Sequence, residues 1–440
     1  MPSPFFQLEL ASELNMAEGP SHRASIPAAS SVVRLVNSDS PEVQSFLLDH
    51  KEALAEEFQK VLRASARLLK RTEKGEYGPI TGIGVELHHK RGLLIIPIQY
   101  GLTVWVPVKI PDSQLRKRRS SSRRKGRVPG VADQKPLRLP RVFEKIPVKV
   151  MEGNAVPAIA RQAYVAHAEA RDLSPFHSPR TDSLAPEHPI GGSVISRYPL
   201  PRSASPGAPS QPPTESFDDS AAHPGPTDWG TLGIAIRDSN GLTLGFTCAH
   251  VIDSGKAYST EPAPSSDQSV EPFIGEVYRS SYDPRMGVDV SAVRLGEDYV
   301  EGILDLQEEF RHLRYLVKPP ARKSRWSWLI QRPVVLRGAR TGRIVHAHIA
   351  MPTVHSIEID GKRFQDLMVL QATSASSSIV APGDSGAAVL VNWNSSWYWI
   401  GIVIAMLSPQ QAVISKLPAC FAACSLKASQ FPKHRLWEFK

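Results

Sequence analysis

The chain has 440 residues, of which 41% are hydrophobic, and its formal net charge is +9. It is longer than one average domain, and its 38 prolines predict long irregular stretches beside a folded core. Three cysteines, Cys248, Cys420 and Cys424, are too few for a disulfide framework, so we expect an intracellular location in the nucleus, the cytoplasm or both. The first residues lack the basic start and continuous apolar stretch of a signal peptide, and no run of about 18 apolar residues exists. No membrane association is therefore expected.

Residues 1–40 are expected to form a disordered tail, and residues 41–72 a helix. Ser40 suits the N-cap and Pro41 the first helical position. Apolar residues then recur every seven positions, at Leu47, Leu54, Val61 and Leu68. This seam predicts packing against the helix's own domain. The alternative is a short coiled coil between two chains, which would make the protein a homo-oligomer.

Residues 75–155 are expected to form a small strand-rich domain that is interrupted by a basic insertion over residues 116–127. The insertion holds eight Lys or Arg residues and no acidic residue, so it carries almost the whole net charge. It is typical of a nuclear import signal that binds an import receptor, of a nucleic-acid or anionic-lipid patch, or of a solvated loop. No aromatic residue interrupts it, which disfavours specific single-strand binding. Of these interpretations we favour a nuclear import signal that binds an import receptor.

A linker is expected over residues 156–188, and a large domain over residues 189–430. Within this domain, the Pro- and Ser-rich stretch 198–228 is a low-complexity insertion. Alternating apolar residues and an Asn240-Gly241 hairpin signal predict two strands just before residue 247.

The stretch Gly383-Asp384-Ser385-Gly386 indicates that Ser385 is a nucleophile in a tight turn. A serine hydroxyl needs a base that takes its proton and donors that hold the oxyanion. The flanking glycines allow unusual backbone angles, so we expect the amides of Gly383 and Ser385 to point at one position and form an oxyanion hole. The alternative interpretation is an ordinary surface turn, because Gly, Asp and Ser are common turn residues.

His250 and Asp289 are the candidate base and acid for Ser385. His250 follows the second predicted strand, where a loop can present it from a rigid scaffold. Asp289 enters an apolar strand, where a carboxylate is costly unless it is paired, for example with an imidazole. Asp253 and Asp283 are weaker candidates because their surroundings are polar and turn-like.

The order His, Asp, Ser is that of the chymotrypsin-type arrangement, and the motifs resemble those of chymotrypsin-like and trypsin-like serine peptidases of the PA clan. Thr247-Cys-Ala-His250, Asp289-Val-Ser-Ala-Val293 and Gly383-Asp-Ser-Gly386 carry the resemblance. It implies a mainly β fold class, with a chymotrypsin-like double β-barrel in the domain 189–430 and a catalytic triad of His250, Asp289 and Ser385 between the barrels.

Weaker motifs resemble an intracellular branch of these peptidases that includes the plant narrow-leaf proteins and bacterial relatives. They are Ile80–Val85, Leu102–Lys109, Ile146–Val150, Pro189–Ser193, Trp229–Gly233 and Gly338–Gly342, and the resemblance covers roughly residues 75–155 and 186–415. It implies a small domain before the peptidase domain.

The same resemblance places Ile379 at the floor of the first specificity pocket, and Ile404 and Met406 along its wall. No charged residue lies at the floor, so we expect a small or apolar side chain before the cleaved bond, or an obstructed pocket. No activation sequence precedes the domain, so Asp384 must bind a partner other than a newly formed N-terminus.

The leading function is an intracellular serine endopeptidase that acts on protein or peptide substrates. The alternatives are a catalytically silent scaffold or regulator with the same fold, and a nucleic-acid-associated protein that uses residues 116–127. Cys420 and Cys424 have the spacing of a metal pair on a helix, but no His or further Cys is near, so we expect buried thiols and no metal or cofactor.

Overall fold

The computed structural model describes most of the folded chain and leaves several stretches undescribed. The described residues are 34–36, 41–90, 93–96, 98–107, 139–153, 155–158, 160–162, 193–196, 227–258, 273–296, 313–316, 323–342, 344–374, 377–393, 396–431 and 434–435. The basic insertion 116–127 and almost all of the insertion 198–228 lie outside them.

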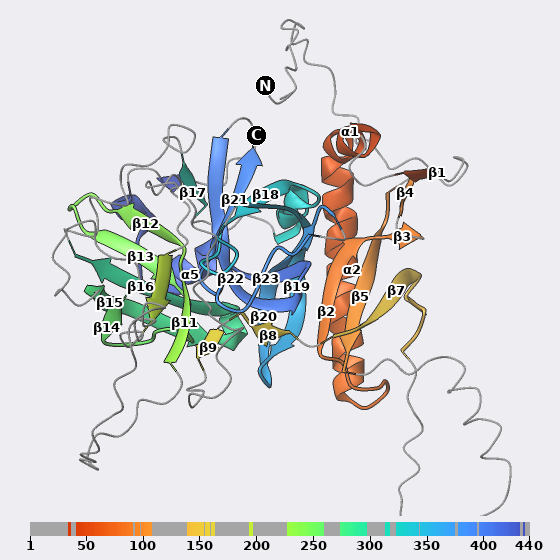
Figure 1. The fold of residues 1–440 in the computed structure, drawn as a ribbon. Helices are drawn as coiled ribbons and strands as arrows, with labels where there is room; N and C mark the ends of the chain where they lie inside the picture. Colours follow the sequence, from red (N-terminus) through yellow and green to blue (C-terminus); the bar gives the residue numbers. More distant parts are fainter. Residues whose placement is uncertain are drawn as a thin grey trace, which may run out of the picture.

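Strands dominate the described residues and form two barrels, which are mostly green and mostly blue in Figure 1. The first barrel contains β10 (Ser193–Ser196), β11 (Thr227–Leu232), β12 (Ile234–Arg237), β13 (Thr243–Thr247), β14 (Lys256–Tyr258), β15 (Phe273–Asp283) and β16 (Val288–Leu295). The second contains β18 (Pro333–Leu336), β19 (Val345–Ile359), β20 (Lys362–Ala372), β21 (Ala388–Trp393), β22 (Ser396–Ser408) and β23 (Gln411–Lys416).

Strand pairing returns to its start in the second barrel, whereas the first barrel is joined at one point by the chain itself. In the second barrel, β18 pairs with both β21 and β19, which joins the two ends of the strand order. In the first barrel, Gly233 alone separates β11 from β12, and β14 reaches β10 through one residue pair, Ser196 and Tyr258. A Cβ atom at Gly233 would lie 2.0 Å from the carbonyl oxygen of Gly386, so this bend requires glycine. These pairings confirm the mainly β fold class, with strand pairing closing the second barrel.

An N-terminal layer, orange in Figure 1, extends the second barrel. β2 (Gly82–Leu87) pairs with β19, so the small strand-rich region continues the same sheet through β5 (Tyr100–Val106), β7 (Ile146–Glu152) and β6 (Val142–Phe143). A separate small sheet contains β1 (Arg34–Val36), β4 (Leu93–Ile96) and β3 (His89–Lys90). β1 therefore lies inside the stretch that the sequence predicts to be a tail.

The predicted helix over 41–72 consists of two helices, α1 (Pro41–Asp49) and α2 (Lys51–Glu73). His50, with φ −111° and ψ 17°, leaves the helical conformation between them. Three residues of the heptad seam, Leu54, Val61 and Leu68, are buried in a cluster with side chains of β2 and β5. The helix therefore packs on its own molecule, which is the first of the two sequence-based alternatives.

Shorter elements complete the described structure. They are β8 (Val156–Pro157), β9 (Ala160–Gln162), η1 (Pro284–Met286), β17 (Arg314–Leu316), η3 (Lys323–Leu329), α5 (Leu417–Ala423), η4 (Ala428–Gln430) and β24 (His434–Arg435). Among the described residues, no helix is long and apolar enough to cross a membrane.

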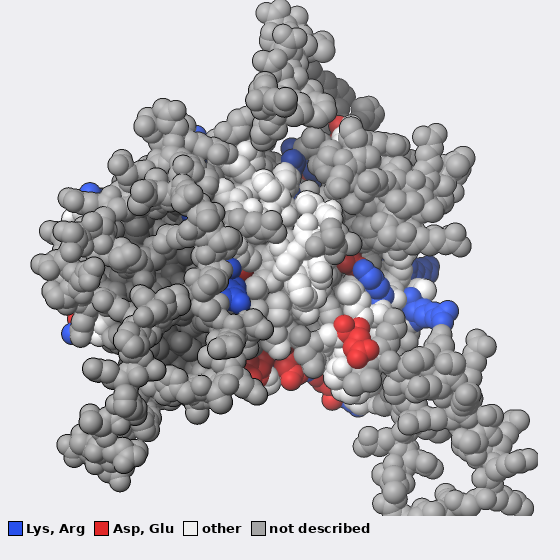
Figure 2. Space-filling model, in the orientation of Figure 1, with Lys and Arg blue, Asp and Glu red and all other residues white. Residues whose placement is uncertain are grey.

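Lys and Arg side chains are scattered over the face of the molecule in Figure 2. Where described residues are visible there, the basic side chains form small separate groups and the middle of the face carries few charges. This face therefore offers no continuous basic surface from its described residues, and the nucleic-acid alternative depends on the undescribed insertion.

Candidate active site

His250 and Asp289 are brought together by the pairing of β13 with β16. Thr247, the last residue of β13, lies opposite Ser291 of β16, so the turn after β13 runs beside the start of β16. The backbone N–H of His250 donates to Oδ1 of Asp289 at 3.1 Å. The side chain of Asp289 is almost fully buried, which makes a paired partner necessary.

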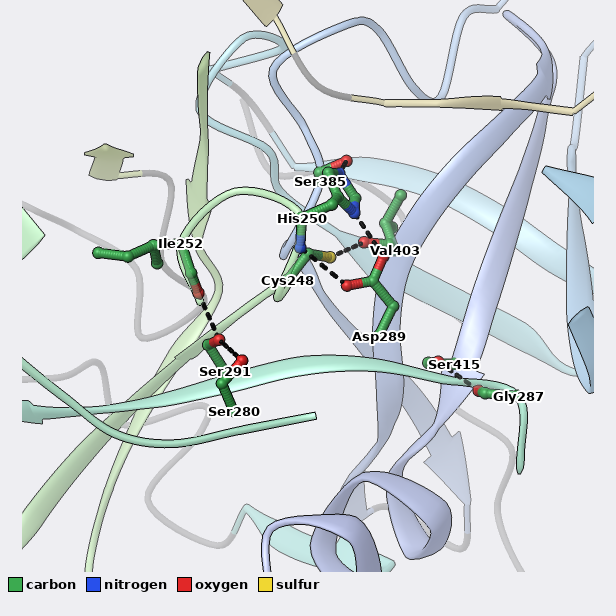
Figure 3. A network of polar contacts seen from close by, with 10 residues as sticks. All are labelled: Cys248, His250, Ile252, Ser280, Gly287, Asp289, Ser291, Ser385, Val403 and Ser415. Carbon is green, nitrogen blue, oxygen red and sulfur yellow. Dashed lines mark hydrogen bonds and ion pairs between the residues drawn. The ribbon is translucent and has the colours of Figure 1, made fainter. Parts of the chain in front are cut away.

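A continuous hydrogen-bond chain links Asp289, His250 and Ser385 (Figure 3). Nδ1 of His250 bonds to Oδ2 of Asp289, and Nε2 of His250 lies 2.9 Å from Oγ of Ser385. The imidazole therefore bridges a carboxylate of the first barrel and a hydroxyl of the second. With Nδ1–H donating to the carboxylate, Nε2 is the acceptor for the hydroxyl proton.

The turn around Ser385 requires its glycines. Gly383 and Gly386 have φ angles of +109° and +99°, which residues with a side chain rarely adopt. A Cβ atom at Gly386 would lie 2.1 Å from the carbonyl oxygen of Thr231. Thr231 also fixes the turn directly, since its N–H donates to the Ser385 carbonyl at 2.7 Å and its hydroxyl to the Gly383 carbonyl at 2.8 Å. Both barrels therefore hold the serine in place.

Asp384 finds its partner in the loop 338–342. Its Oδ1 accepts hydrogen bonds from the N–H groups of Arg340 and Thr341 at 2.9 and 3.1 Å, and its Oδ2 accepts one from Ala381 at 2.9 Å. A Cβ atom at Gly338 would lie 2.0 Å from Oδ1 of Asp384, so the loop can come this close to Asp384 only with glycine at position 338. Burial raises the pKa of Asp384 to about 6, and the three backbone donors act against this shift.

The backbone amides of Gly383 and Ser385 point at one oxygen atom. That atom is the carbonyl oxygen of Ala158, which accepts both N–H groups at 2.7 and 2.9 Å. Two convergent amides next to Ser385 have the arrangement of an oxyanion hole, as expected from the sequence. In this structure the carbonyl oxygen of Ala158 occupies the oxyanion hole.

The three predicted pocket residues divide between two buried clusters. Ile379 lies in the same cluster as Ala158, and the half-buried Met406 packs against it. Ile404 lies in the other cluster, with Phe246 and Trp399. The structure therefore places Ile379 and Met406 with Ala158 on one side of β22, and Ile404 in the cluster on the other side. At the predicted floor of the pocket, Ile379 is fully buried and apolar.

Cys248 lies close to the hydrogen-bond chain but does not belong to it. The ligand-type atoms of Cys248, His250 and Asp289 lie within 4.8 Å of one another, a grouping that can hold a metal ion in other proteins. Here the thiol of Cys248 donates to the carbonyl of Val403 at 3.1 Å, and the imidazole already bonds to Asp289 and Ser385 (Figure 3). Burial and the charge of Asp289 raise the pKa of this thiol well above its usual value. The residues therefore fit a protonated thiol better than a metal ligand.

The sequence did not predict the segments that contact the site through main-chain atoms. Val156 to Ala158, expected in the linker over 156–188, lie in the site instead, and β8 and β9 begin that stretch. Nothing in the residue types of this segment marks it, because its bonds to the site use main-chain atoms. Thr231 was also missed, although it lies in one of the recognised motifs.

Comparisons with known proteins give matches only among solved structures. A scan against protein-family models gives no match, and a search of curated proteins gives none. The Nocardiopsis protease NAPase is 13% identical, covers 45% of this chain and 90% of its own, and has a TM-score of 0.30. The active form of the Rv3671c protease from M. tuberculosis is 16% identical, covers 55% and 82%, and has a TM-score of 0.28. An inactive mutant of the murine norovirus NS6 protease is 14% identical, covers 42% and 87%, and has a TM-score of 0.26. These values are low, so the proposals below rest on residues of this chain.

Proposed function

We propose that the chain is a serine endopeptidase of the chymotrypsin-like type that hydrolyses peptide bonds through Ser385, His250 and Asp289. The observation that carries the proposal is the continuous bond chain from Asp289 through His250 to Oγ of Ser385, next to two amides that converge on a carbonyl oxygen. A nucleophile, its base, the residue that orients the base and an oxyanion hole are the parts that acyl transfer needs.

Each part has a definite task in this mechanism. Oγ of Ser385 attacks the carbonyl carbon while Nε2 of His250 takes its proton, and the resulting oxyanion accepts the N–H groups of Gly383 and Ser385. His250 then gives the proton to the leaving amine. Water hydrolyses the acyl-enzyme in a second pass through the same steps. Asp289 holds the tautomer of His250 and stabilises the imidazolium.

Serine is a better nucleophile candidate than Cys248 in this site. Ser385 Oγ is within hydrogen-bond distance of Nε2, whereas the thiol of Cys248 donates to Val403. The thiolate is the reactive form of cysteine, and the raised pKa of Cys248 disfavours that form.

The substrate is proposed to carry a small or apolar residue before the cleaved bond. The cluster at this position contains Ile379 and Val403, with Met406 against it. A cationic side chain would lose its hydration there, and the predicted floor residue, Ile379, cannot pair with its charge.

The serine turn is proposed to form without a cut that creates a new N-terminus to bind Asp384. Asp384 already accepts hydrogen bonds from Arg340, Thr341 and Ala381, so it needs no newly created N-terminus to hold the serine turn. We further propose an intracellular location, since the three cysteines are free and buried.

Labelling with a fluorophosphonate, which reacts with activated serines, tests the proposal. The purified wild type is expected to form a covalent adduct at Ser385, Ser385→Ala none, and Cys248→Ala the same adduct as the wild type. A folded chain that shows neither adduct nor peptide hydrolysis would identify a catalytically silent scaffold. Loss of labelling in Cys248→Ala with retained labelling in Ser385→Ala would identify a cysteine nucleophile.

A further inference from the structure

A segment of the chain's own backbone passes through the candidate active site. It consists of residues 155–158 and 160–162, here called the crossing segment, and includes β8 and β9. In Figure 1, β8 and β9 lie at the boundary between the first and second barrels. The two halves of the crossing segment pair with different barrels, and Ala158 lies between them.

The half before Ala158 adds a short strand to the second barrel. Pro157 lies opposite Ala405, and Val156 opposite Met406, in antiparallel pairing with β22. β22 also supplies Met406 at the predicted wall of the specificity pocket. An extended peptide that pairs with an exposed strand is a common way for proteins to bind peptides.

Ala158 fills the centre of the site. Its carbonyl oxygen accepts the amides of Gly383 and Ser385 at 2.7 and 2.9 Å. The residue is 0% exposed and belongs to the apolar cluster that contains Ile379, where the residue before a cleaved bond is expected. Its methyl side chain has the small, apolar character that this cluster favours.

The half after Ala158 pairs with the first barrel. Ala160 lies opposite Trp229 of β11, followed by Arg161 opposite Asp228 and Gln162 opposite Thr227. The crossing segment therefore pairs with the second barrel before Ala158 and with the first barrel from Ala160 onward, and it spans the junction that holds His250 and Ser385. Together the two halves hold the Ala158 carbonyl against the amides of Gly383 and Ser385, next to the nucleophile.

We propose that the crossing segment is an intramolecular substrate and that the protein cleaves itself on the carboxyl side of Ala158. This proposal rests on the proposed serine peptidase activity and assigns its first substrate. Oγ of Ser385 forms a bond to the Ala158 carbonyl carbon, and His250 takes the hydroxyl proton. The bond from that carbon to the nitrogen of Ile159 then breaks, and His250 returns the proton to the new amine. Water hydrolyses the Ala158 ester to a carboxylate and restores Ser385.

The cut divides the chain into residues 1–158 and 159–440. The first fragment stays attached through the pairing of β2 with β19, so the two fragments remain one folded unit. The new carboxylate at Ala158 no longer has a covalent link to the primed side, so β8 can leave β22 and open the site to other peptides. Self-cleavage therefore converts a chain whose site is filled into one that can act on a second substrate.

The test follows the intact mass and the N-terminal sequence of denatured full-length protein. Wild type is compared with Ser385→Ala, with Ala158→Asp, which puts a carboxylate into the apolar pocket, and with Val142→Asp. Val142 is 59% exposed on β6, so this control adds the same charge away from the site. Wild type and Val142→Asp are expected to yield a fragment that begins Ile-Ala-Arg-Gln. Ser385→Ala and Ala158→Asp are expected to stay intact.

Dilution and fluorophosphonate labelling complete the experiment. The half-time of cleavage is expected to stay constant on dilution, because the substrate is part of the same chain. Ala158→Asp is expected to be labelled at Ser385, since its site is no longer filled. If Ala158→Asp does not fold, the comparison of wild type with Ser385→Ala carries the test by itself.

The outcomes separate this proposal from the proposed function. Labelling of Ser385 in a wild-type chain that stays intact at Ala158 would overturn self-cleavage and leave the peptidase proposal standing; the crossing segment would then act as an inhibitor. A cut after Ala158 in Ser385→Ala as well would assign it to a foreign protease and also overturn the inference. Failure of both wild type and Ala158→Asp to react with the probe would reject the peptidase proposal itself.

Discussion

The Nε2 atom of His250 lies 2.9 Å from Oγ of Ser385, although 135 residues separate the two in the chain. His250 belongs to the first barrel and Ser385 to the second, and each is also held by contacts from the other barrel. Thr231 of the first barrel fixes the turn of Ser385, and the thiol beside His250, that of Cys248, bonds to Val403 of the second. The contact therefore depends on how the two barrels dock, and substitutions at their junction should change activity before they unfold either barrel.

The orientation of His250 by Asp289 is the first test of this arrangement. Asp289→Asn keeps the shape of the side chain but removes the carboxylate that selects the Nδ1–H tautomer, so kcat should fall by about 10⁴-fold. The rate of fluorophosphonate labelling should fall with it. Asp253→Asn is the matched control, because Asp253 is exposed and lies near His250 in sequence. An equal loss in both variants would contradict the assigned role of Asp289.

Gly338 should tolerate no side chain. In Gly338→Ala the new methyl group would lie 2.0 Å from Oδ1 of Asp384, so the loop must move away and release its hydrogen bonds to the serine turn. We expect a loss of activity together with a lower melting temperature. Gly296→Ala is the control, since its Cβ would meet only the carbonyl oxygen of Ile274, at 3.8 Å. Full activity in Gly338→Ala would show that this loop does not support the turn.

The raised pKa of Asp384 predicts a dependence of stability on pH. The ordinary pKa of 3.8 applies to the unfolded chain and a pKa of about 6 to the folded one, so the folded state binds more protons between these values. The free energy of unfolding contributed by this group is therefore full below pH 4 and is lost as the pH rises through 6. For a shift of about two pKa units the loss is about 3 kcal/mol.

Asp384→Asn isolates this contribution because it cannot titrate. Chemical unfolding of both proteins between pH 4 and pH 7 should show the wild type losing stability relative to the variant as the pH rises. The variant should be less active at every pH, since an amide cannot accept all three backbone N–H groups as well as a carboxylate does. A difference in stability that does not change with pH would show that the Asp384 carboxylate is not destabilised by burial.

The sequence predicts the chemistry of the site better than its surroundings. His250, Asp289 and Ser385 are recognisable because their residue types and order carry information, and the motifs around them predict the β fold. The Asn240-Gly241 turn predicts only the local pairing of β12 with β13. The crossing segment was expected in a linker, because its contacts are backbone hydrogen bonds that any residue can make. Only the smallness of Ala158 is specific to its position, and alanine is too common to mark it.

Long-range pairing explains the other differences. β1 lies in the expected tail because its partner, β4, is about 60 residues away, and local composition does not record such a partner. The pairing of β2 with β19, which fuses the N-terminal layer to the second barrel, depends in the same way on residues far apart in sequence. The break at His50 is local, yet histidine is not a residue that usually ends a helix.

The composition of the pocket predicts which peptides the enzyme cuts once its site is open. A library that varies the residue before the cleaved bond should show preference for alanine or another small apolar residue, and little cleavage after Arg, Lys, Asp or Glu, because the predicted floor residue, Ile379, is buried and apolar. Met406→Ala should enlarge the pocket and shift the preference toward leucine and phenylalanine, as a change in kcat/KM for each peptide. Ile404→Ala is the matched control on the same strand, since Ile404 faces the other cluster. It should lower stability without changing the order of preference. A wild-type preference for Arg or Lys would place a carboxylate in the pocket and would contradict the position of Ile379.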